Sequence, residues 1–188
     1  MQDIMLDLET LGTEPNAIIL SIGMVAFDYQ NNKLGPEFYT PISVLGSVAA
    51  GYQYSDSTLI WWERQTPVAR GVLAEALTTA ITPYAACNSV REYLQQFSPD
   101  VRVWGNGAAF DNELLRGYLR KHYPVPLWKF WNDRCYRTLN ALMAARVEKT
   151  DPLASRVGTH HNALDDAKTQ ALRAMQMLRL MEAEGLPL

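Results

Sequence analysis

Two acidic residues near the amino terminus, Asp7 and Glu9, are the first whose types and spacing suggest chemistry. Residues 4–8 predict a short strand, on which successive side chains point to opposite faces. Asp7 and Glu9 therefore share one face, and Leu8 points the other way, toward the core. Two neighbouring carboxylates repel each other unless a divalent cation lies between them. The pair indicates a metal site, with two solvated acids at a strand end as the alternative.

A third acid, Asp111, follows a predicted strand at residues 101–104 and a loop that contains Gly105 and Gly107. Glycines in such a loop let the main chain approach a ligand closely. Asp111 stands at the start of the next predicted helix, where aspartate often serves as the N-cap. Both roles, helix cap and site residue, are compatible with this position.

A histidine pair and an aspartate pair mark the start of the last predicted helix: His160, His161, Asp165 and Asp166. A histidine on the loop before a helix can reach over a site to which an acid in the first helical turn contributes. A solvated histidine and two acids that favour the helix dipole are the alternative. Neither aspartate lies on the apolar stripe of the helix, so periodicity does not choose between Asp165 and Asp166.

The three motifs together, in this order, resemble the DEDDh branch of the DnaQ-like 3′–5′ exonucleases. Asp7 and Glu9 match the first motif of that family, Asp111 matches the second, and His161 and Asp166 match the third. This match selects Asp166 over its neighbour. The sequence is most similar to phage and bacterial members named exonuclease VIII-like or exoribonuclease-like.

The resemblance implies a chemistry for these five residues. The four carboxylates would bind two divalent metal ions, Mg²⁺ or Mn²⁺, which oxygen ligands favour over zinc. His161 would take a proton from the attacking water. The substrate would be the 3′ end of single-stranded DNA or RNA, and the product a nucleoside 5′-monophosphate. Similarity to the subgroup slightly favours DNA.

The resemblance also points to residues that hold the strand end. Thr10 and Leu11 follow the first acid pair and are predicted to contact the terminal base, although many family members have a second threonine where this chain has Leu11. The other predicted substrate-binding residues are a loop amide and three aromatics with stacking faces: Asn106, Phe110, Trp61 and Trp62. Core packing is the alternative for the aromatics, since Trp and Phe are usually buried.

Composition sets limits on the class of protein. The net charge is −3, but residues 101–160 hold ten Lys/Arg against five Asp/Glu, whereas residues 1–100 hold four against eleven. The middle segment predicts either a basic surface for phosphates or an ordinary solvated one. Apolar runs stay below the roughly 18 residues of a membrane span. With two distant cysteines and no secretory signal, a cytoplasmic protein without membrane association is expected.

The elements that must position these residues can also be predicted. Strands are expected at 4–8, 17–29, 38–42 and 101–104, the first three as an antiparallel meander. Helices are expected around Trp61 and Trp62, from Pro67, at 83–97, 111–122 and 136–146, and from residue 162. This pattern predicts an α/β fold with a mixed sheet flanked by helices. The resemblance implies the RNase H-like version, as a single exonuclease domain over residues 1–188.

Two other functions fit the same features. One is a domain of the same fold that binds nucleic acid without cleaving it. The other is a phosphoesterase that acts on short oligonucleotides. Similar proteins commonly dimerise, so a homodimer is compatible with the resemblance.

Overall fold

The computed structural model describes residues 2–149 and 151–186. Within them the chain forms a five-stranded sheet with the order β3-β2-β1-β4-β5. The strands are β1 (Asp3–Thr10), β2 (Ile19–Asp28), β3 (Lys33–Pro41), β4 (Arg102–Gly105) and β5 (Asp133–Cys135). β1, β2 and β3 pair antiparallel, whereas β4 runs parallel to both β1 and β5. The predicted antiparallel meander of the first three strands is confirmed, and the parallel pairs make the sheet mixed.

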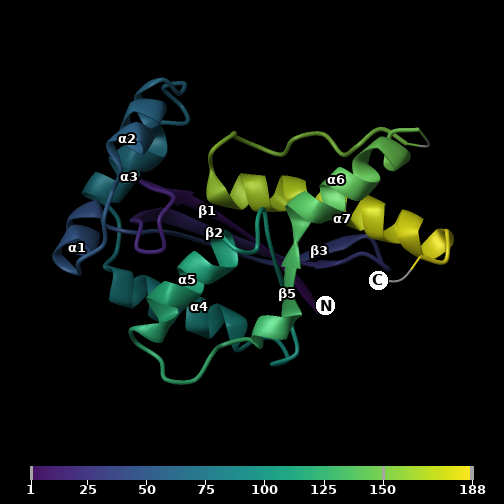
Figure 1. The fold of residues 1–188 in the computed structure, drawn as a ribbon, viewed down its shortest axis with the longest axis horizontal. Helices are drawn as coiled ribbons and strands as arrows, with labels where there is room; N and C mark the ends of the chain where they lie inside the picture. Colours follow the sequence, from purple (N-terminus) through teal and green to yellow (C-terminus); the bar gives the residue numbers. More distant parts are fainter. Residues whose placement is uncertain (1, 150, 187–188) are drawn as a thin grey trace.

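Helices cover both faces of this sheet, as Figure 1 shows. α6 (Tyr136–Val147) and α7 (Ala163–Ala183) pack on one face, and α4 (Pro83–Leu94) and α5 (Asp111–Arg120) pack on the other. Three short helices lie at the left of the view: α1 (Val44–Ala49), α2 (Asp56–Glu63) and α3 (Gly71–Thr78). The predicted mixed sheet flanked by helices is therefore confirmed. No helix within residues 2–149 and 151–186 combines the length and apolar character needed to span a bilayer.

The alternation of side chains along β1 decides where the acids lie. Ile4 and Leu6 belong to the apolar core under α4 and α5. Met5 belongs to the core under α6 and α7. Asp7 and Glu9 continue the face of Met5, because side chains two residues apart share a face. Both acids therefore point toward α7.

One helix begins later than the sequence predicts. The sequence predicts a helix from Pro67. Thr66 precedes it, and the Thr66 Oγ1 accepts the N–H of Ala69 at 3.2 Å. The N–H of Arg70 bonds four residues back to the carbonyl of Thr66, but the N–H groups of Gly71 and Val72 bond only three residues back, to the carbonyls of Val68 and Ala69. This tighter pattern ends the first turn, so α3 starts only at Gly71.

Three short elements in the described residues were not predicted: α1, β5 and the 3₁₀ helix η1 (Phe130–Asn132). β5 has three residues, too few for an alternating pattern to be visible in the sequence. It forms because β4 offers a free edge, with Trp104 paired to Arg134. Tertiary pairing, not local sequence, creates this strand.

Candidate active site

Three acids from two elements meet at the carboxyl end of β1. Carboxylate oxygens of Asp7, Glu9 and Asp166 all lie within 4.8 Å of one another. Their exposed fractions are 8%, 7% and 6%. β1 supplies the first two and the first turn of α7 supplies the third. Three carboxylates that meet in a nearly dry site cannot all ionise without compensating positive charge.

A glycine on β2 brings α7 close enough for this meeting. Gly23 pairs with Asp7 across the β1–β2 ladder, so both residues face α7. A Cβ at Gly23 would overlap the main chain of Ala163 and Leu164. Asn162 caps the same helix end, accepting the N–H groups of Leu164 and Asp165 at 3.1 Å each. The first turn of α7 therefore rests directly on the sheet, beside Asp7.

Asp111 approaches from the first turn of α5, at the carboxyl end of β4. A Cβ at Gly105 would come within 2.9 Å of the Asp111 Cβ, so glycine leaves room for the helix start as well as the loop. Asp111 is 3% exposed, and its Oδ2 has no hydrogen-bond partner among the described residues. Its side chain does not act as a helix cap, since the N-cap position is Phe110 and no side chain bonds there.

The acids strongly perturb one another. Burial raises the pKa of Asp7 well above its usual range, and the charges of Asp111, Glu9 and Asp166 raise it further. Burial and the charges of Asp166 and Asp111 raise the pKa of Glu9 to about 8. Burial raises the pKa of Asp111 to about 7, although main-chain hydrogen bonds and the charge of Arg137 act in the opposite direction. Asp111 therefore belongs electrostatically to the same cluster.

The paired aspartates of α7 point to different partners. Asp165 Oδ2 accepts the N–H of Thr159 at 2.7 Å, which ties it to the preceding loop. Asp166 Oδ2 accepts the N–H of His161 at 3.0 Å, while the same carboxylate reaches Asp7 and Glu9. The geometry thus brings Asp166, not Asp165, to the other acids.

His161 lies on the loop directly before α7 with φ at +64°. A positive φ is unfavourable for a residue with a Cβ and often marks a functional position. Its ring makes edge contacts with Trp61 and Trp62, at centroid distances of 4.9 and 5.8 Å, and stacks on His160 at 3.8 Å. Burial and the charge of His160 lower the pKa of His161, against the charge of Asp166. The ring is therefore neutral at pH 7 and able to accept a proton.

The donor set fits a divalent cation. Asp7, Glu9, Asp111 and Asp166 offer only oxygen, which suits Mg²⁺ or Mn²⁺. The buried, unpartnered Oδ2 of Asp111 is an atom that a cation would satisfy. A second group of potential ligand atoms, from His160, His161 and Asp166, also lies within 4.8 Å. Because Asp166 belongs to both groups, it is the residue most central to the site.

Most of the predicted substrate-binding residues surround one cavity of about 410 Å³ beside Glu9. Thr10, Phe110, Trp61 and Trp62 all line it. Trp61 is 42% exposed, whereas Trp62 is 1% exposed and its Nε1 donates to the carbonyl of Thr10 at 2.9 Å. Trp61 and the half-buried Phe110 can offer ring faces to a ligand, while Trp62 holds α2 against the end of β1.

Two predicted substrate-binding residues lie elsewhere. Leu11 is 3% exposed and packs within the apolar core, because the chain turns inward after β1. Its side chain is not available to a terminal base, which corrects the prediction made for it. Asn106 is half-buried on the loop after β4, and its carbonyl accepts Arg137 Nη2 at 2.7 Å.

Three further side chains contact the acids or act on them through their charge, and the sequence does not single them out. Gln170 Nε2 donates to Asp7 Oδ1 at 2.7 Å. Arg156, from the loop before α7, forms an ion pair with Asp166, and its charge acts to lower the pKa of Glu9. Arg137 bonds the loop after β4, and its charge acts on Asp111. Gln170 lies four residues after Asp166 and so on the same helical face, whereas Arg137 and Arg156 are indicated only by the basic composition of residues 101–160.

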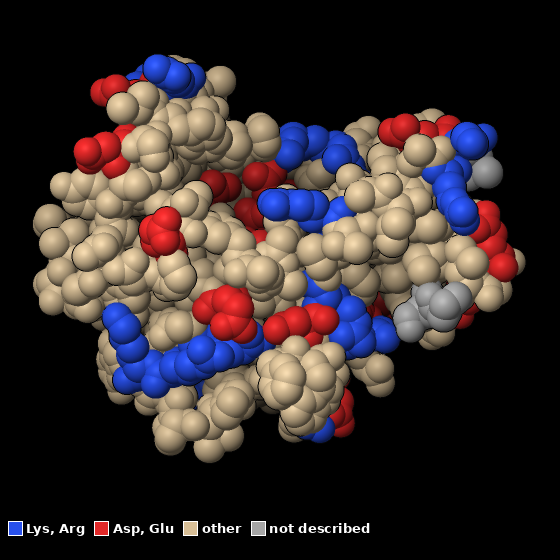
Figure 2. Space-filling view, viewed as in Figure 1, with Lys and Arg blue, Asp and Glu red and all other residues tan. Residues whose placement is uncertain are grey.

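The surface view agrees with this arrangement. Figure 2 shows acidic side chains at the bottom of a hollow, with Lys and Arg side chains beside them. Cations at the rim of an acidic hollow allow an anionic ligand to approach acids that would otherwise repel it.

Comparisons by sequence match this chain to nucleases. Residues 2–178 match the family described as "3′-5′ exoribonuclease Rv2179c-like domain". A curated relative, named "Exodeoxyribonuclease" from Enterobacteria phage T4, is 25% identical over 208 residues, which cover 95% of this chain and 90% of the relative.

Solved structures share the fold. E. coli Exonuclease I in complex with a dT13 oligonucleotide matches with a TM-score of 0.65 and 15% identity, over 96% of this chain and 42% of that one. The complex of E. coli Exonuclease I with a 5cy-dA13 oligonucleotide gives 0.64 and 16%, over the same shares. This chain thus spans about two fifths of those proteins. At such identities the likeness shows the fold alone.

Proposed function

Because this chain belongs to the family of Rv2179c-like 3′–5′ exoribonuclease domains, we propose that it is a metal-dependent phosphodiesterase that shortens single-stranded nucleic acid from the 3′ end. The family and the fold support a 3′–5′ exonuclease acting on nucleic acid. One observation carries the rest of the proposal: oxygens of Asp7, Glu9 and Asp166 lie within 4.8 Å of one another, and the N–H of His161 donates to Asp166.

In this proposal the four carboxylates, Asp7, Glu9, Asp111 and Asp166, hold two divalent cations, Mg²⁺ or Mn²⁺. Such ions supply charge neutralisation at phosphorus and Lewis-acid activation of water. Bound cations would stabilise the ionised form of these carboxylates, because burial and mutual repulsion raise the pKa values of Asp7, Glu9 and Asp111. Gln170 keeps Asp7 oriented through its 2.7 Å hydrogen bond.

His161 is assigned the role of general base. A ring nitrogen would accept the proton of the attacking water, and the lowered pKa of His161 keeps that nitrogen free near neutral pH. The water oxygen bonds to phosphorus as the bond to the 3′ oxygen of the preceding nucleotide breaks. The phosphate stays with the departing nucleotide, which leaves as a nucleoside 5′-monophosphate. Trp61 and Trp62 limit where the ring can move.

Arg137 and Arg156 are assigned to substrate phosphates. Both are exposed, and both act electrostatically on the acids. A guanidinium suits a phosphate because it can donate two parallel hydrogen bonds. The cavity beside Glu9, with Thr10, Trp61 and Phe110 on its walls, would hold the terminal nucleoside.

The preferred sugar is proposed to be deoxyribose. The phage T4 relative is named an exodeoxyribonuclease, and the matched E. coli structures carry dT13 and dA13 oligonucleotides. The description of the family names an exoribonuclease instead, so RNA is the competing substrate. We also propose a single exonuclease domain, a cytoplasmic location and a homodimer.

The direct test uses 5′-labelled DNA and RNA strands of identical sequence, with Mg²⁺, with Mn²⁺ and with EDTA. We expect a ladder of shortening labelled products with either metal, none with EDTA, and a higher initial rate on DNA. A dinucleotide tested beside the long strand separates an exonuclease from a phosphoesterase of short oligomers. Immediate release of a labelled mononucleotide, or cutting of closed circles, would contradict the polarity or the exonuclease character.

A further inference from the structure

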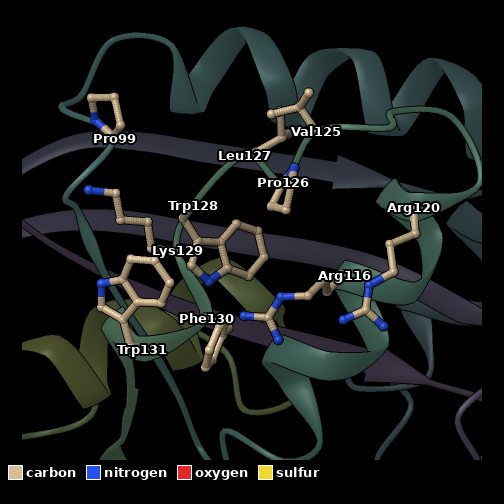
Figure 3. A pocket seen from close by; sticks show the side chains of 10 residues that line it. All are labelled: Pro99, Arg116, Arg120, Val125, Pro126, Leu127, Trp128, Lys129, Phe130 and Trp131. Atoms are coloured by element: carbon tan, nitrogen blue, oxygen red, sulfur yellow. The ribbon is translucent and has the colours of Figure 1, made fainter.

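A pocket unrelated to the acids lies at the far end of α5. It has a volume of about 360 Å³ and is formed by the last turns of α5 and the segment that leads into β5. Figure 3 shows Trp128 in the middle, Phe130 and Trp131 on one side, and Arg116 and Arg120 on the other. The pocket is thus built from both aromatic and basic side chains.

Two aromatic side chains of this pocket are exposed to solvent, where they contribute nothing to the buried core. Phe130 and Trp131 are 68% and 62% exposed and touch edge to face, with ring centroids 5.0 Å apart. Trp128, by contrast, is 2% exposed, and its Nε1 donates to Asp133 Oδ1 at 2.8 Å. An exposed apolar patch beside an anchored ring is typical of a binding surface.

The charged side chains that line the pocket indicate what kind of ligand it can bind. The charged side chains that line the pocket are all cations, Arg116, Arg120 and Lys129, and no acid among the described residues lines it. Arg116 is buried and bonds both oxygens of Asp133 at 2.7 Å, so its charge is committed.

The other two cations remain available. Arg120 lies 3.6 Å from Glu113, and Lys129 pairs with Asp100. All four of these side chains are exposed, and exposed ion pairs are weak. Arg120 and Lys129 can therefore exchange their partners for a phosphate.

We propose that this pocket binds the substrate strand several nucleotides before its 3′ end. Bases stack on Phe130 and Trp131, and phosphates face Arg120 and Lys129. Exposed aromatics combined with cations are the composition that holds single strands without regard to sequence. A purely apolar partner would gain nothing from the two available cations, Arg120 and Lys129. This inference rests on the proposed exonuclease function and adds a second contact with the same strand.

Geometry sets the strand length at which the pocket acts. α5 begins at Asp111, in the acid cluster, and ends at Arg120, in the pocket wall. Ten helical residues span about 14 Å between those two ends. At a stacked spacing of about 3.4 Å per nucleotide, this distance corresponds to roughly four nucleotides. Shorter strands occupy the active site without reaching the pocket.

The test compares a trinucleotide with a strand of about 12 nucleotides. Trp131→Ala should raise KM for the long strand about tenfold, since one stacked base contributes about that factor or more. It should leave kcat, and the KM for the trinucleotide, unchanged. Trp131→Phe should restore most of the affinity. Leu142→Ala is the control for removing an exposed apolar side chain, because Leu142 is 69% exposed and lies on α6.

The cations are tested by a matched pair. Arg120→Gln should raise KM for the long strand, whereas Arg146→Gln should not. The Arg146 side chain is 55% exposed, against 63% for Arg120, but it lies near the end of α6 and pairs with Glu184. Equal KM values for wild type and Trp131→Ala on the long strand would overturn the inference. A dimer in solution that Trp131→Ala converts to a monomer would also overturn it, since a second copy would then fill the pocket.

The proposed function can fail separately. If the wild type cleaves neither strand in Mg²⁺ or Mn²⁺, the exonuclease assignment is wrong. Fluorescence anisotropy of the labelled long strand in EDTA then tests the pocket alone. Weaker binding by Trp131→Ala than by Leu142→Ala supports the pocket, and equal binding rejects it.

Discussion

Replacing Glu9 by Gln should remove activity and at the same time stabilise the metal-free protein. Glu9 is 7% exposed and lies within 4.8 Å of two other carboxylates. Burial and the charges of Asp166 and Asp111 raise its pKa to about 8, against a value of 4.5 for an unperturbed side chain. Glutamine has the shape of the protonated acid and never acquires the charge. It therefore removes the cost of ionising this side chain in the folded state.

The sign of the pH dependence follows from proton binding. Between pH 4.5 and about 8 the folded protein holds a proton on Glu9 that the unfolded chain has released. The stability of the wild type should therefore fall as pH rises through this window. At about 1.4 kcal/mol per pH unit, Glu9→Gln should gain about 3–5 kcal/mol over the wild type at pH 8, and about 1 kcal/mol at pH 5. For a chain of this length the gain at pH 8 corresponds to roughly 10 °C in Tm.

The measurement is thermal unfolding by circular dichroism in EDTA at several pH values from 5 to 8. The difference in Tm between wild type and Glu9→Gln is the informative quantity, because ionisations outside the acid cluster affect both proteins alike. Glu63→Gln, an exposed glutamate on α2, should leave the wild-type profile unchanged. Excess Mn²⁺ should reduce the difference, since the ion binds the folded wild type and stabilises it by mass action. A difference that stays constant from pH 5 to pH 8 would refute the reasoning.

Three further predictions concern the same site. Alanine at each of the other three carboxylates, Asp7, Asp111 and Asp166, should abolish cleavage. Each variant should keep the circular dichroism spectrum of the folded protein and show a smaller rise in Tm with Mn²⁺. Full activity of the wild type in excess EDTA would contradict the metal requirement. His161→Ala should lower kcat by about 10²–10⁴-fold, leave the dependence of Tm on metal concentration unchanged and recover activity partly at high pH. His160→Ala should keep most activity. The reverse result would identify His160 as the general base. Arg156→Gln should lower kcat/KM by about 10–100-fold through loss of a charged hydrogen bond to phosphate, and Arg146→Gln, assayed beside it, should not.

Much of the fold and the family could be predicted because the relevant signals are local. Alternation along β1 places Asp7 and Glu9 on one face, and the structure has both pointing toward α7. The order of the three motifs indicated the DEDDh exonucleases, and the family match confirms that resemblance. Spacing alone could not separate Asp165 from Asp166, because the distinction depends on a bond from Thr159 across the loop.

Several unpredicted features of the site depend on contacts between segments that are separated in the sequence. Gly23 reads as an ordinary strand glycine until Ala163 is seen against it. Arg156 sits in a loop without regular spacing, and only the folded chain brings its guanidinium to Asp166. Leu11 follows an acidic motif and suggested a substrate contact, yet the chain turns it into the core. A local pattern shows what a residue can do, and long-range packing decides whether its side chain reaches the place to do it.

The distribution of charge explains how an acidic chain can serve as a nuclease. The net charge of −3 opposes binding of a polyanion, and the acids of the site would repel a phosphate most strongly. Residues 101–160, which hold ten of the seventeen Lys/Arg, supply Arg137 and Arg156 beside those acids and Arg120 and Lys129 around the distal pocket. One group of cations therefore lies near each end of α5, and together they would attract the phosphates of a bound strand. In the proposed function the acids bind metal ions, and these ions rather than the acids face the phosphate.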